Sequence, residues 1–310
     1  MAKYDYFKII RGMIKDPKVR FFYLSKMGFY DRMPDEKYLA KKYKVYTGLT
    51  LDLEHPVRYN EKLQWLKLHY HKPVHSIMVD KYLVRQYIAD TIGEQYLIPL
   101  LGVWDHFDDI DFDQLPDQFV LKCTHDSGGI VICTDKSSLD RNKAKARIEQ
   151  CLNRKYYLAG RERVYESVKP RIIAEKYMTD GKTNDQKEEL SDYKIHCFSG
   201  EPKLVQIMTN RFSSTGIINE HYTLDWERLN LVRGDSKLGD VLVPRPAKLD
   251  ELLELAKILS KDEPYIRTDF YIVEDHVYFG ELTFYPSSGF KPFHPDDWDF
   301  VLGDWIKLPE

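Results

Sequence analysis

The sequence predicts an α+β fold with a helical N-terminal region. Apolar residues recur at helical spacing through the first quarter of the chain, and from Asp80 onward strand-like and helical segments alternate. The length of 310 residues is enough for about two domains at roughly 150 residues each. We therefore expect three parts: residues 1–79, residues 80–190 and residues 191–310.

Composition places the chain among folded globular proteins. Hydrophobic residues make up 43% of it and charged residues 31%, which excludes a disordered or fibrous chain. The net charge of -3 argues against a nucleic acid partner, because a polyanion is held by a surplus of basic side chains.

Neither a membrane span nor a secretory signal is expected. The longest apolar runs, such as residues 96–104, fall short of the roughly 18 residues that a transmembrane helix needs. The basic start of the chain lacks the continuous apolar core of a signal peptide. The four cysteines show no CxxC spacing, so we expect free thiols in a reducing cytoplasm: Cys123, Cys133, Cys151 and Cys197.

The N-terminal region is expected to form several helices. Tyr6, Ile9 and Met13 recur at helical spacing, and Asn60 is expected to cap a helix that follows it. A basic amphipathic start is usually a solvated helix face docked on the rest of the protein, but it leaves peripheral contact with an anionic membrane open.

Two clusters resemble metal sites without matching one. His69, His71 and His75 are spaced like zinc ligands, but a helix turns the first two apart, so we expect three surface histidines. Residues 105–117 are rich in aspartate but lack the glycine and terminal glutamate of a calcium-binding EF-hand loop. A solvated acidic loop is expected there.

Residues 119–134 are expected to form a hairpin whose turn holds Gly128 and Gly129. Small residues let backbone N–H groups close over phosphate oxygens, and Lys122 would project from the first strand toward the same charge. The segment lacks the GxxxxGK[ST] pattern of a P-loop, and an ordinary surface turn is the alternative.

The segment 171–178 is expected to be a short apolar strand that ends in Glu175 and Lys176. An extended edge could offer main-chain groups to a purine beside an apolar wall such as Met178. The alternative is an ordinary strand end.

Two further strands are expected over residues 192–207, with Asp192 and Lys194 on one face. A long polar insertion, residues 179–191, precedes them. Arg211 follows these strands, and a solvated surface arginine is the alternative to a functional role for it.

A last hairpin is expected over residues 267–284. If residues 274–276 form a three-residue turn, Val273 faces Val277, and counting outward puts Asp269 opposite Glu281. Arg267 then lies opposite Thr283.

Opposed carboxylates in apolar strands suggest a bridging hard cation such as Mg²⁺, because like charges directly opposite each other are destabilising. Two alternatives stay open. The hairpin edge could be exposed with both acids solvated, or a one-residue bulge could place the two carboxylates on opposite faces.

The order of these segments resembles the ATP-grasp superfamily of carboxylate–amine ligases. The flanking motifs are similar to those of its TupA-like branch, named for teichuronopeptide biosynthesis and found in polysaccharide gene clusters. The motifs are Tyr59-Asn-Glu-Lys-Leu-Gln-Trp65, Asp80-Lys-Tyr82, Leu115-Pro116, Phe119-Val-Leu-Lys122, Asp192-Tyr-Lys194, Arg267-Thr-Asp269 and Phe279-Gly-Glu-Leu-Thr283.

The resemblance implies an ATP-grasp fold, in which two α+β subdomains, 80–190 and 191–310, clasp ATP. It implies that Lys122 and Lys194 contact the phosphates of ATP, and that a lid containing His125, Ser127, Gly128 and Gly129 closes over them. Adenine would be held by Glu175, Lys176 and Met178. The ribose would be held by Asp192 or by an acid of residues 180–189. It also implies Mg²⁺ ligands Asp269, Glu281 and Thr283, the last where many relatives have Asn, with Arg211 and Arg267 at the γ-phosphate and transition state. Ser287, Ser288 and Gly289 would hold the acceptor carboxylate.

The chemistry implied is formation of an acylphosphate from ATP and a carboxylate, followed by attack of an amine to give an amide. The acceptor expected from the branch is a sugar carboxylate, a uronic acid of a capsular or cell-surface polysaccharide. One alternative is a sugar-nucleotide-dependent glycosyltransferase that uses the acids Asp109, Asp111 and Asp113. A non-catalytic scaffold is disfavoured, because the key charged residues are present.

Overall fold

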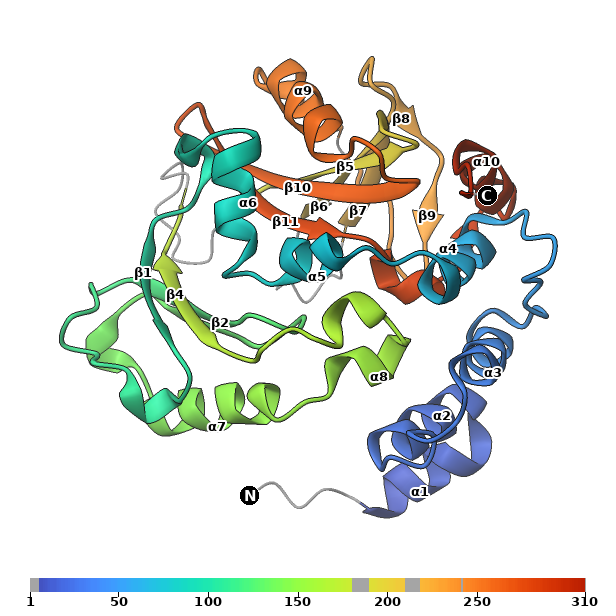
Figure 1. Cartoon of the computed structure of the whole chain (residues 1–310), viewed down its shortest axis with the longest axis horizontal. Helices are drawn as coiled ribbons and strands as arrows, with labels where there is room; N and C mark the ends of the chain where they lie inside the picture. The colour runs from blue at the N-terminus through green and yellow to red at the C-terminus, as the bar shows by residue number, and fades with distance from the viewer. Residues whose placement is uncertain (1–5, 180–189, 210–217, 241, 310) are drawn as a thin grey trace.

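The computed structural model describes residues 6–179, 190–209, 218–240 and 242–309. It contains two larger antiparallel sheets, a small two-stranded sheet and a set of N-terminal helices, which confirms the predicted α+β class (Figure 1). The strands before residue 180 form the four-stranded sheet, and most of the strands after residue 191 form the six-stranded one. The division into domains at 79/80 and 190/191 stays a prediction.

From residue 6 onward, six α-helices precede the first strand. They are α1 (Tyr6–Lys15), α2 (Pro17–Lys26), α3 (Asp35–Thr47), α4 (Tyr59–His69), α5 (Pro73–Val79) and α6 (Val84–Thr91). Figure 1 shows α1 and α2 at one end of the molecule, away from both sheets, and α5 and α6 beside the strands.

The cap of α4 differs from the prediction. Asn60 lies inside the first turn, where its side chain donates to the Lys291 carbonyl. The free backbone N–H groups are instead satisfied by Glu61, which accepts from Arg58, and by Asp299, which accepts from Asn60. Asp299 belongs to α10 (Asp297–Trp305), 239 residues from Asn60. The local sequence around α4 therefore could not predict this capping residue.

The first sheet has the strand order β1-β4-β2-β3. Its strands are β1 (Leu100–Trp104), β2 (Phe119–Cys123), β3 (Ile130–Cys133) and β4 (Ile172–Lys176), with α7 (Arg141–Leu152) and α8 (Tyr156–Gly160) between β3 and β4. The predicted hairpin of β2 and β3 is confirmed, with Phe119 opposite Cys133. Phe119, Leu121 and Ile148 are fully buried between the sheet and α7.

The predicted extended edge at residues 171–178 is wrong for the strand itself. β4 is an interior strand, paired with β1 on one side and β2 on the other. The ladder takes up its main-chain groups through Lys176, whose N–H donates to the Pro99 carbonyl. A position between two partners is decided by the topology of the sheet, which the local sequence does not contain.

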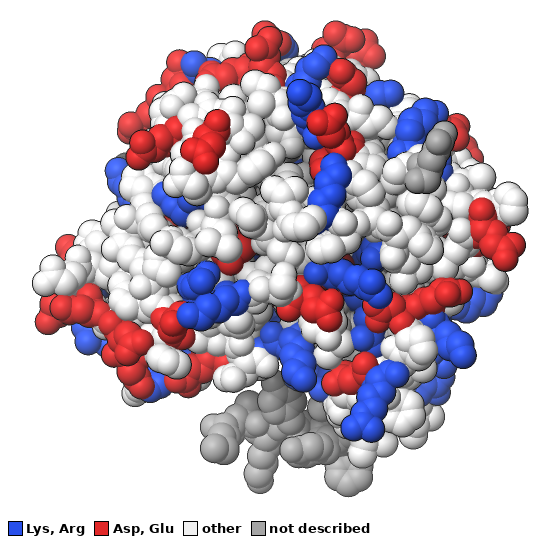
Figure 2. All heavy atoms as spheres, viewed as in Figure 1, with Lys and Arg blue, Asp and Glu red and all other residues white. Residues whose placement is uncertain are grey.

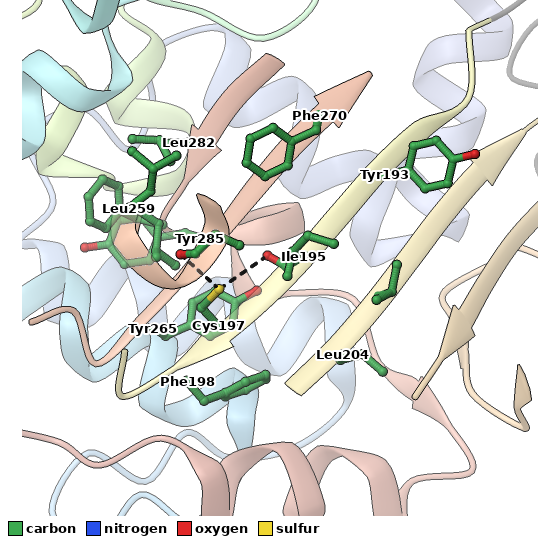
Figure 3. Close-up of a cluster of buried hydrophobic side chains, with 14 of the residues drawn as sticks. Tyr193, Ile195, Cys197, Phe198, Leu204, Leu259, Tyr265, Phe270, Leu282 and Tyr285 are labelled. Atoms are coloured by element: carbon green, nitrogen blue, oxygen red, sulfur yellow. Dashed lines mark hydrogen bonds between the residues drawn. The ribbon is translucent and has the colours of Figure 1, made fainter. Parts of the chain in front are cut away.

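The second sheet has the order β11-β10-β5-β6-β7-β8. Its strands are β5 (Asp192–Phe198), β6 (Glu201–Thr209), β7 (Ile218–Tyr222), β8 (Arg228–Leu229), β10 (Tyr265–Val273) and β11 (His276–Thr283). α9 (Leu249–Leu259) covers one face, and the Cys197 thiol points into the cluster of buried side chains there, donating to the Ala256 carbonyl (Figure 3). All four cysteines are free and buried, as predicted.

The other face of this sheet is polar. Because side chains alternate along a strand, Asp192, Lys194 and His196 of β5 point away from α9. Their cross-strand partners on β10 are Tyr271, Asp269 and Arg267, and Gln206 of β6 lies opposite Lys194. This polar face looks toward α5, α6 and the first sheet.

The hairpin of β10 and β11 reaches the predicted register by a different route. The turn has two residues, Glu274 and Asp275, both with positive φ, so Val273 faces His276 and not Val277. A bulge between Asp269 and Phe270 on one strand and Phe279 and Glu281 on the other then shifts the pairing by one residue. The two deviations cancel, and Asp269 does lie opposite Glu281, with Arg267 opposite Thr283.

Two short strands complete the structure, β9 (Val232–Arg233) paired with β12 (Phe293–His294). No helix in the described ranges is both long and apolar enough to cross a membrane. On the face drawn in Figure 2, Lys and Arg side chains are interspersed with Asp and Glu.

Candidate functional site

A cavity of about 190 Å³ opens between the two sheets. Strands β2 and β4 supply one wall, β5, β10 and β11 supply the opposite wall, and α5, α6 and the turn between them contribute a third. Its charged lining is Lys81, Arg85, Lys122, Glu175, Asp192, Lys194, Asp269 and Glu281. Apolar side chains, among them Met78, Val79, Ile98, Ile130, Phe279 and Leu282, line the rest.

On the first sheet, Glu175 holds two cations. Its Oε2 accepts from Lys122 Nζ at 2.6 Å, and its Oε1 accepts from Arg85 Nη1 at 3.2 Å. Lys122 lies opposite Ile173 in the ladder, so its aim into the cavity follows from the alternation of β2. The first sheet thus presents the Lys122 ammonium of β2 beside the Glu175 carboxylate of β4.

On the second sheet, Lys194 lies between two buried carboxylates. Its Nζ donates to Asp192 Oδ2 at 2.6 Å and also to Asp269 Oδ2. Lys194 and Asp269 are directly opposite each other on neighbouring strands, which is why the pair forms.

Arg267 bridges the opposed carboxylates. Its Nε is 2.6 Å from Asp269 Oδ1, and its Nη2 is 2.7 Å from Asp269 Oδ2 and 3.0 Å from both Glu281 Oε1 and Thr283 Oγ1. Asp269 is almost fully buried, whereas 46% of the Glu281 side chain is exposed toward the cavity.

These charges shift one another's pKa values. Desolvation raises the pKa of Glu281, but Arg267, Lys194 and Lys81 outweigh it, so the pKa lies below its usual value. Burial lowers the pKa of Arg267, but Asp269 and Glu281 outweigh it and raise the pKa. Both groups are therefore ionised at neutral pH, and the site is an array of fixed charges.

His196 lies opposite Arg267 and was not singled out from the sequence. Its Nδ1 accepts from the Tyr265 hydroxyl at 2.7 Å, and its Nε2 donates to Gln206 Oε1 at 2.8 Å. Burial and the neighbouring Arg267 lower its pKa well below the usual value. A neutral imidazole therefore lies beside Arg267 on the neighbouring strand and adds no charge to the site.

The loop between β2 and β3 is anchored at its base and exposed at its tip. His125 is buried, and its Nε2 donates to the Arg154 carbonyl at 3.2 Å, away from the cavity. Gly129 is buried and donates to Asp126 Oδ1, whereas Ser127 and Gly128 are exposed. Of the four residues predicted here as a lid, Ser127 lines the cavity.

At the end of β4, Lys176 is exposed and Met178 is half-buried, and neither lines the cavity that Glu175 lines. Because the ladder ends at Lys176, main-chain groups for a base can come only from the residues after it. Their role at adenine stays a prediction.

The loop Ser287–Gly289 lies apart from the cavity, four residues beyond Thr283. All three of its residues have positive φ, of 50°, 54° and 64°. Gln64 Nε2 donates to the Gly289 carbonyl at 2.9 Å, and a Cβ on Gly289 would lie 2.4 Å from that nitrogen. Only glycine fits there, and α4 fixes the shape of the loop.

Lys67 ties this loop to α8. Its Nζ donates to Ser288 Oγ at 2.9 Å, to the Ser288 carbonyl at 2.8 Å and to the Gly160 carbonyl at 2.9 Å. Burial lowers the pKa of Lys67 to about 7. The lysine therefore joins α4, the end of α8 and the loop that follows the hairpin of β10 and β11.

Sequence reasoning missed Lys81, Arg85, Gln64 and Lys67. The last two had a local signal, because polar residues three apart sit beside Leu63 and Leu66 on the inward face of α4. Lys81 lies in the motif Asp80-Lys-Tyr82, which marked the segment but not a role for the lysine. Arg85 had no signal, since its approach to Glu175 depends on how α6 docks.

The two sequence clusters that resemble metal sites do not form one in the described residues. Within the described ranges no group of three or more His, Cys, Asp and Glu side chains could hold a metal ion. His75 is fully buried and contacts Glu263 at 3.2 Å, so the expectation of three surface histidines is wrong for it. The acids Asp109, Asp111 and Asp113 are exposed in a loop away from the cavity.

Arg211 and residues 180–189 lie outside the described residues. The predicted roles of Arg211 at the γ-phosphate and of an acid of 180–189 at the ribose therefore stay predictions.

Solved structures similar to the chain include two D-alanine–D-alanine ligases. The one from Bacillus anthracis, complexed with ATP, is 15% identical, with 67% of this chain and 53% of that chain covered and a TM-score of 0.37. The one from Helicobacter pylori is also 15% identical, with 82% and 68% covered and a TM-score of 0.41. A RimK domain ATP-grasp protein from Sphaerobacter thermophilus is 12% identical, with 75% and 69% covered and a TM-score of 0.39.

The chain spans about half the length of the Bacillus anthracis ligase, and no curated protein sequence matches it. A family model described as TupA-like ATP-grasp matches residues 61–307. The match extends over most of the chain and confirms both the resemblance and the predicted ATP-grasp fold. The chain belongs to the TupA-like ATP-grasp family.

Proposed function

We propose that the protein is an ATP-dependent carboxylate–amine ligase whose site is the cavity between the two sheets. The observation that carries this proposal is one cavity lined by Lys122 and Lys194 together with the carboxylates Asp269 and Glu281. Arg267 adds a third cation, bonded to both of these acids. Three cations can neutralise a polyphosphate, and two carboxylates can hold its metal. Transfer of a phosphoryl group needs alignment and charge more than a protein nucleophile.

ATP would lie along the cavity with its phosphates at the charged end. Lys122 and Lys194 are the phosphate contacts, and each now donates to a carboxylate that the phosphates would replace. Adenine would reach the main chain beyond β4, beside Met178, and Asp192 is the candidate for the ribose. The apolar lining from Met78, Ile98 and Leu282 fits the flat faces of a base.

The donor set fits Mg²⁺. Asp269 and Glu281 are opposed carboxylates, Thr283 adds a hydroxyl 3.2 Å from Glu281 Oε1, and hard oxygen ligands are those that Mg²⁺ prefers. When bound, the ion would neutralise the β- and γ-phosphate oxygens. Arg267 now spans the two acids, which shows that a positive charge is accommodated between them.

The reaction has two steps. A substrate carboxylate oxygen attacks the γ-phosphorus, and the bond from that phosphorus to the β-phosphate oxygen breaks. ADP departs, and the substrate becomes an acylphosphate. An amine nitrogen then attacks the acyl carbon, phosphate departs, and the nitrogen loses a proton to give the amide. Arg267 would stabilise charge on the transferring group, and its position is held by its two hydrogen bonds to Asp269.

The acceptor would bind beside Ser287, Ser288 and Gly289. This loop follows the metal-binding hairpin directly, and its shape is fixed by Gln64 and Lys67. From the TupA-like branch we expect a sugar carboxylate, the uronic acid of a capsular or cell-surface polysaccharide, joined to a small amine. The need for ATP and the four free, buried thiols favour a cytoplasmic reaction.

The test is phosphorus NMR of the protein with Mg-ATP, hydroxylamine and a panel of sugar carboxylates. Hydroxylamine traps an acylphosphate as a hydroxamate. We expect ADP and phosphate to form only with a particular carboxylate, together with its hydroxamate. Intact ATP with every carboxylate, alongside consumption of a UDP-sugar in a parallel reaction, would replace the ligase with the glycosyltransferase.

A further inference from the structure

The most exposed apolar side chains lie together in one segment, residues 9–29, which we call the α1–α2 arm. Of the large hydrophobic side chains in the described part of the chain, the three most exposed are Ile14 at 72%, Phe29 at 71% and Met27 at 66%. Ile10 and Phe22, each more than half exposed, belong to the same arm. Five large apolar side chains, each more than half exposed, thus gather within residues 10–29, and such a concentration is typical of an interaction site.

The arm is already packed on the rest of the chain by other residues. Phe21 and Tyr30 are buried and stack with ring centroids 4.9 Å apart, above Tyr38 of α3. α1 lies against α2 at Gly12, where a Cβ would stand 3.2 Å from Val19 Cγ1. The exposed side chains are therefore additional to those that hold the arm in place.

The arm is also basic. Its five Lys and Arg residues are all exposed and its single acid is Asp16, a net charge of +4 in a chain whose total is -3. The basic residues are Arg11, Lys15, Lys18, Arg20 and Lys26. Ile10 and Ile14 share one face of α1, four residues apart, with Arg11 and Lys15 directly beside them in the sequence.

From this combination we infer that the arm docks on an anionic lipid bilayer. Its isoleucine, phenylalanine and methionine side chains would enter the boundary between headgroups and acyl chains, and its lysines and arginines would contact lipid phosphates. A second copy of the chain is a poorer occupant, because two arms of +4 repel each other. An acidic protein surface would match the charge of the arm, but it would not bury the exposed apolar side chains.

Docking would also orient the proposed acceptor site. Phe290, next to Gly289, is part of the small core that carries the arm, where its ring lies 6.2 Å from that of Tyr46. The arm and the loop Ser287–Gly289 are therefore joined through one packed cluster. This step rests on the proposed function: it would present the acceptor loop near the bilayer, where a lipid-linked sugar carboxylate could reach it.

Flotation of the full chain with vesicles tests the docking itself, without nucleotide or acceptor. One set of vesicles contains phosphatidylcholine alone and the other includes about one third phosphatidylglycerol. We expect binding to the anionic vesicles at least about tenfold stronger than to the neutral ones, and loss of most of it at about 0.5 M salt.

The variant is the double change Ile14→Glu with Phe29→Glu, and its control is Ile258→Glu with Val301→Glu, at exposed apolar positions on α9 and α10. Both pairs add the same charge at exposed sites, and circular dichroism checks that both fold. We expect the first pair to lose flotation at least about tenfold and the control to retain it.

Equal flotation of the two pairs, or no flotation of the wild type with anionic vesicles, would overturn the inference. Self-association in sedimentation without vesicle binding would do so as well, and would assign the arm to a second copy. ATP cleavage in solution should be the same for both pairs, so failure of the ligase and failure of the docking are distinguishable.

Discussion

Arg267 and Asp269 form a two-point ion pair on β10, with Nε 2.6 Å from Oδ1 and Nη2 2.7 Å from Oδ2. The same guanidinium reaches Glu281 at 3.0 Å, so one rigid fork spans both carboxylates of the proposed metal site. In the proposed reaction this fork would exchange part of its contact with the acids for contact with the transferring phosphoryl group.

Substitution of Arg267 should therefore affect turnover more than binding. Arg267→Lys keeps the charge but loses the planar fork, and we expect kcat to fall about 100-fold with little change in the KM for ATP. Steady-state kinetics on ATP cleavage checks this. A rise in KM with kcat unchanged would place Arg267 in ground-state binding instead.

Lys122 should act on ATP binding. Lys122→Met removes a charged hydrogen bond to phosphate, and such bonds contribute about 1.5 to 3 kcal/mol, so the KM for ATP should rise at least about tenfold. The matched control is Lys169→Met, a lysine on the surface that pairs with Asp105. An equal effect of the two substitutions would contradict the placement of the phosphates at Lys122.

The lowered pKa of Lys67 should make the free energy of unfolding depend on pH. Its pKa is about 7 in the folded protein, because burial disfavours the charged form, against about 10.5 in the unfolded chain. Between these values the unfolded chain binds the extra proton, so stability should rise with pH by up to about 1.4 kcal/mol per unit. Urea denaturation from pH 7 to 9.5 should show this rise in the free energy of unfolding for the wild type and a smaller rise for Lys67→Met. An equal dependence on pH in the two proteins would refute the lowered pKa of Lys67.

Gly280 lies at the bulge of the hairpin, next to Glu281. A Cβ at this position would lie 3.0 Å from the Asp269 carbonyl and 3.1 Å from the Tyr271 ring. Gly280→Val should therefore destabilise the protein by about 1 to 3 kcal/mol and reduce Mg-dependent turnover by moving Glu281. Thermal unfolding and kinetics measure the two effects, and full activity with full stability would show that the bulge tolerates a side chain.

The hairpin of β10 and β11 shows what the sequence could predict. Alternation and turn residues were enough to find both strands and to place Asp269 opposite Glu281. The route was wrong for two reasons. The two-residue turn depends on positive φ values at Glu274 and Asp275, which their residue types do not indicate, and the bulge beside Gly280 was not predicted. The prediction survived because two one-residue deviations cancelled.

What failed depended on packing between distant segments. β4 is an interior strand because β1 pairs with it, and His75 is buried because distant segments supply Phe284 and Glu263 beside it. The same holds for Arg85, which reaches Glu175 across 90 residues of sequence. Local periodicity contains no information on which helix will cover which strand.

The most direct measurement is Mg-dependent ATP binding by titration calorimetry. It compares the wild type with Asp269→Asn and Glu281→Gln. The control is Asp250→Asn, which changes an exposed side chain on α9. We predict that the wild type and the control bind ATP more tightly as Mg²⁺ is added, by at least about tenfold, and that both site variants lose this dependence. An unchanged Mg²⁺ dependence in both site variants would contradict the metal site, and no ATP binding by the wild type would contradict the cavity as the nucleotide site.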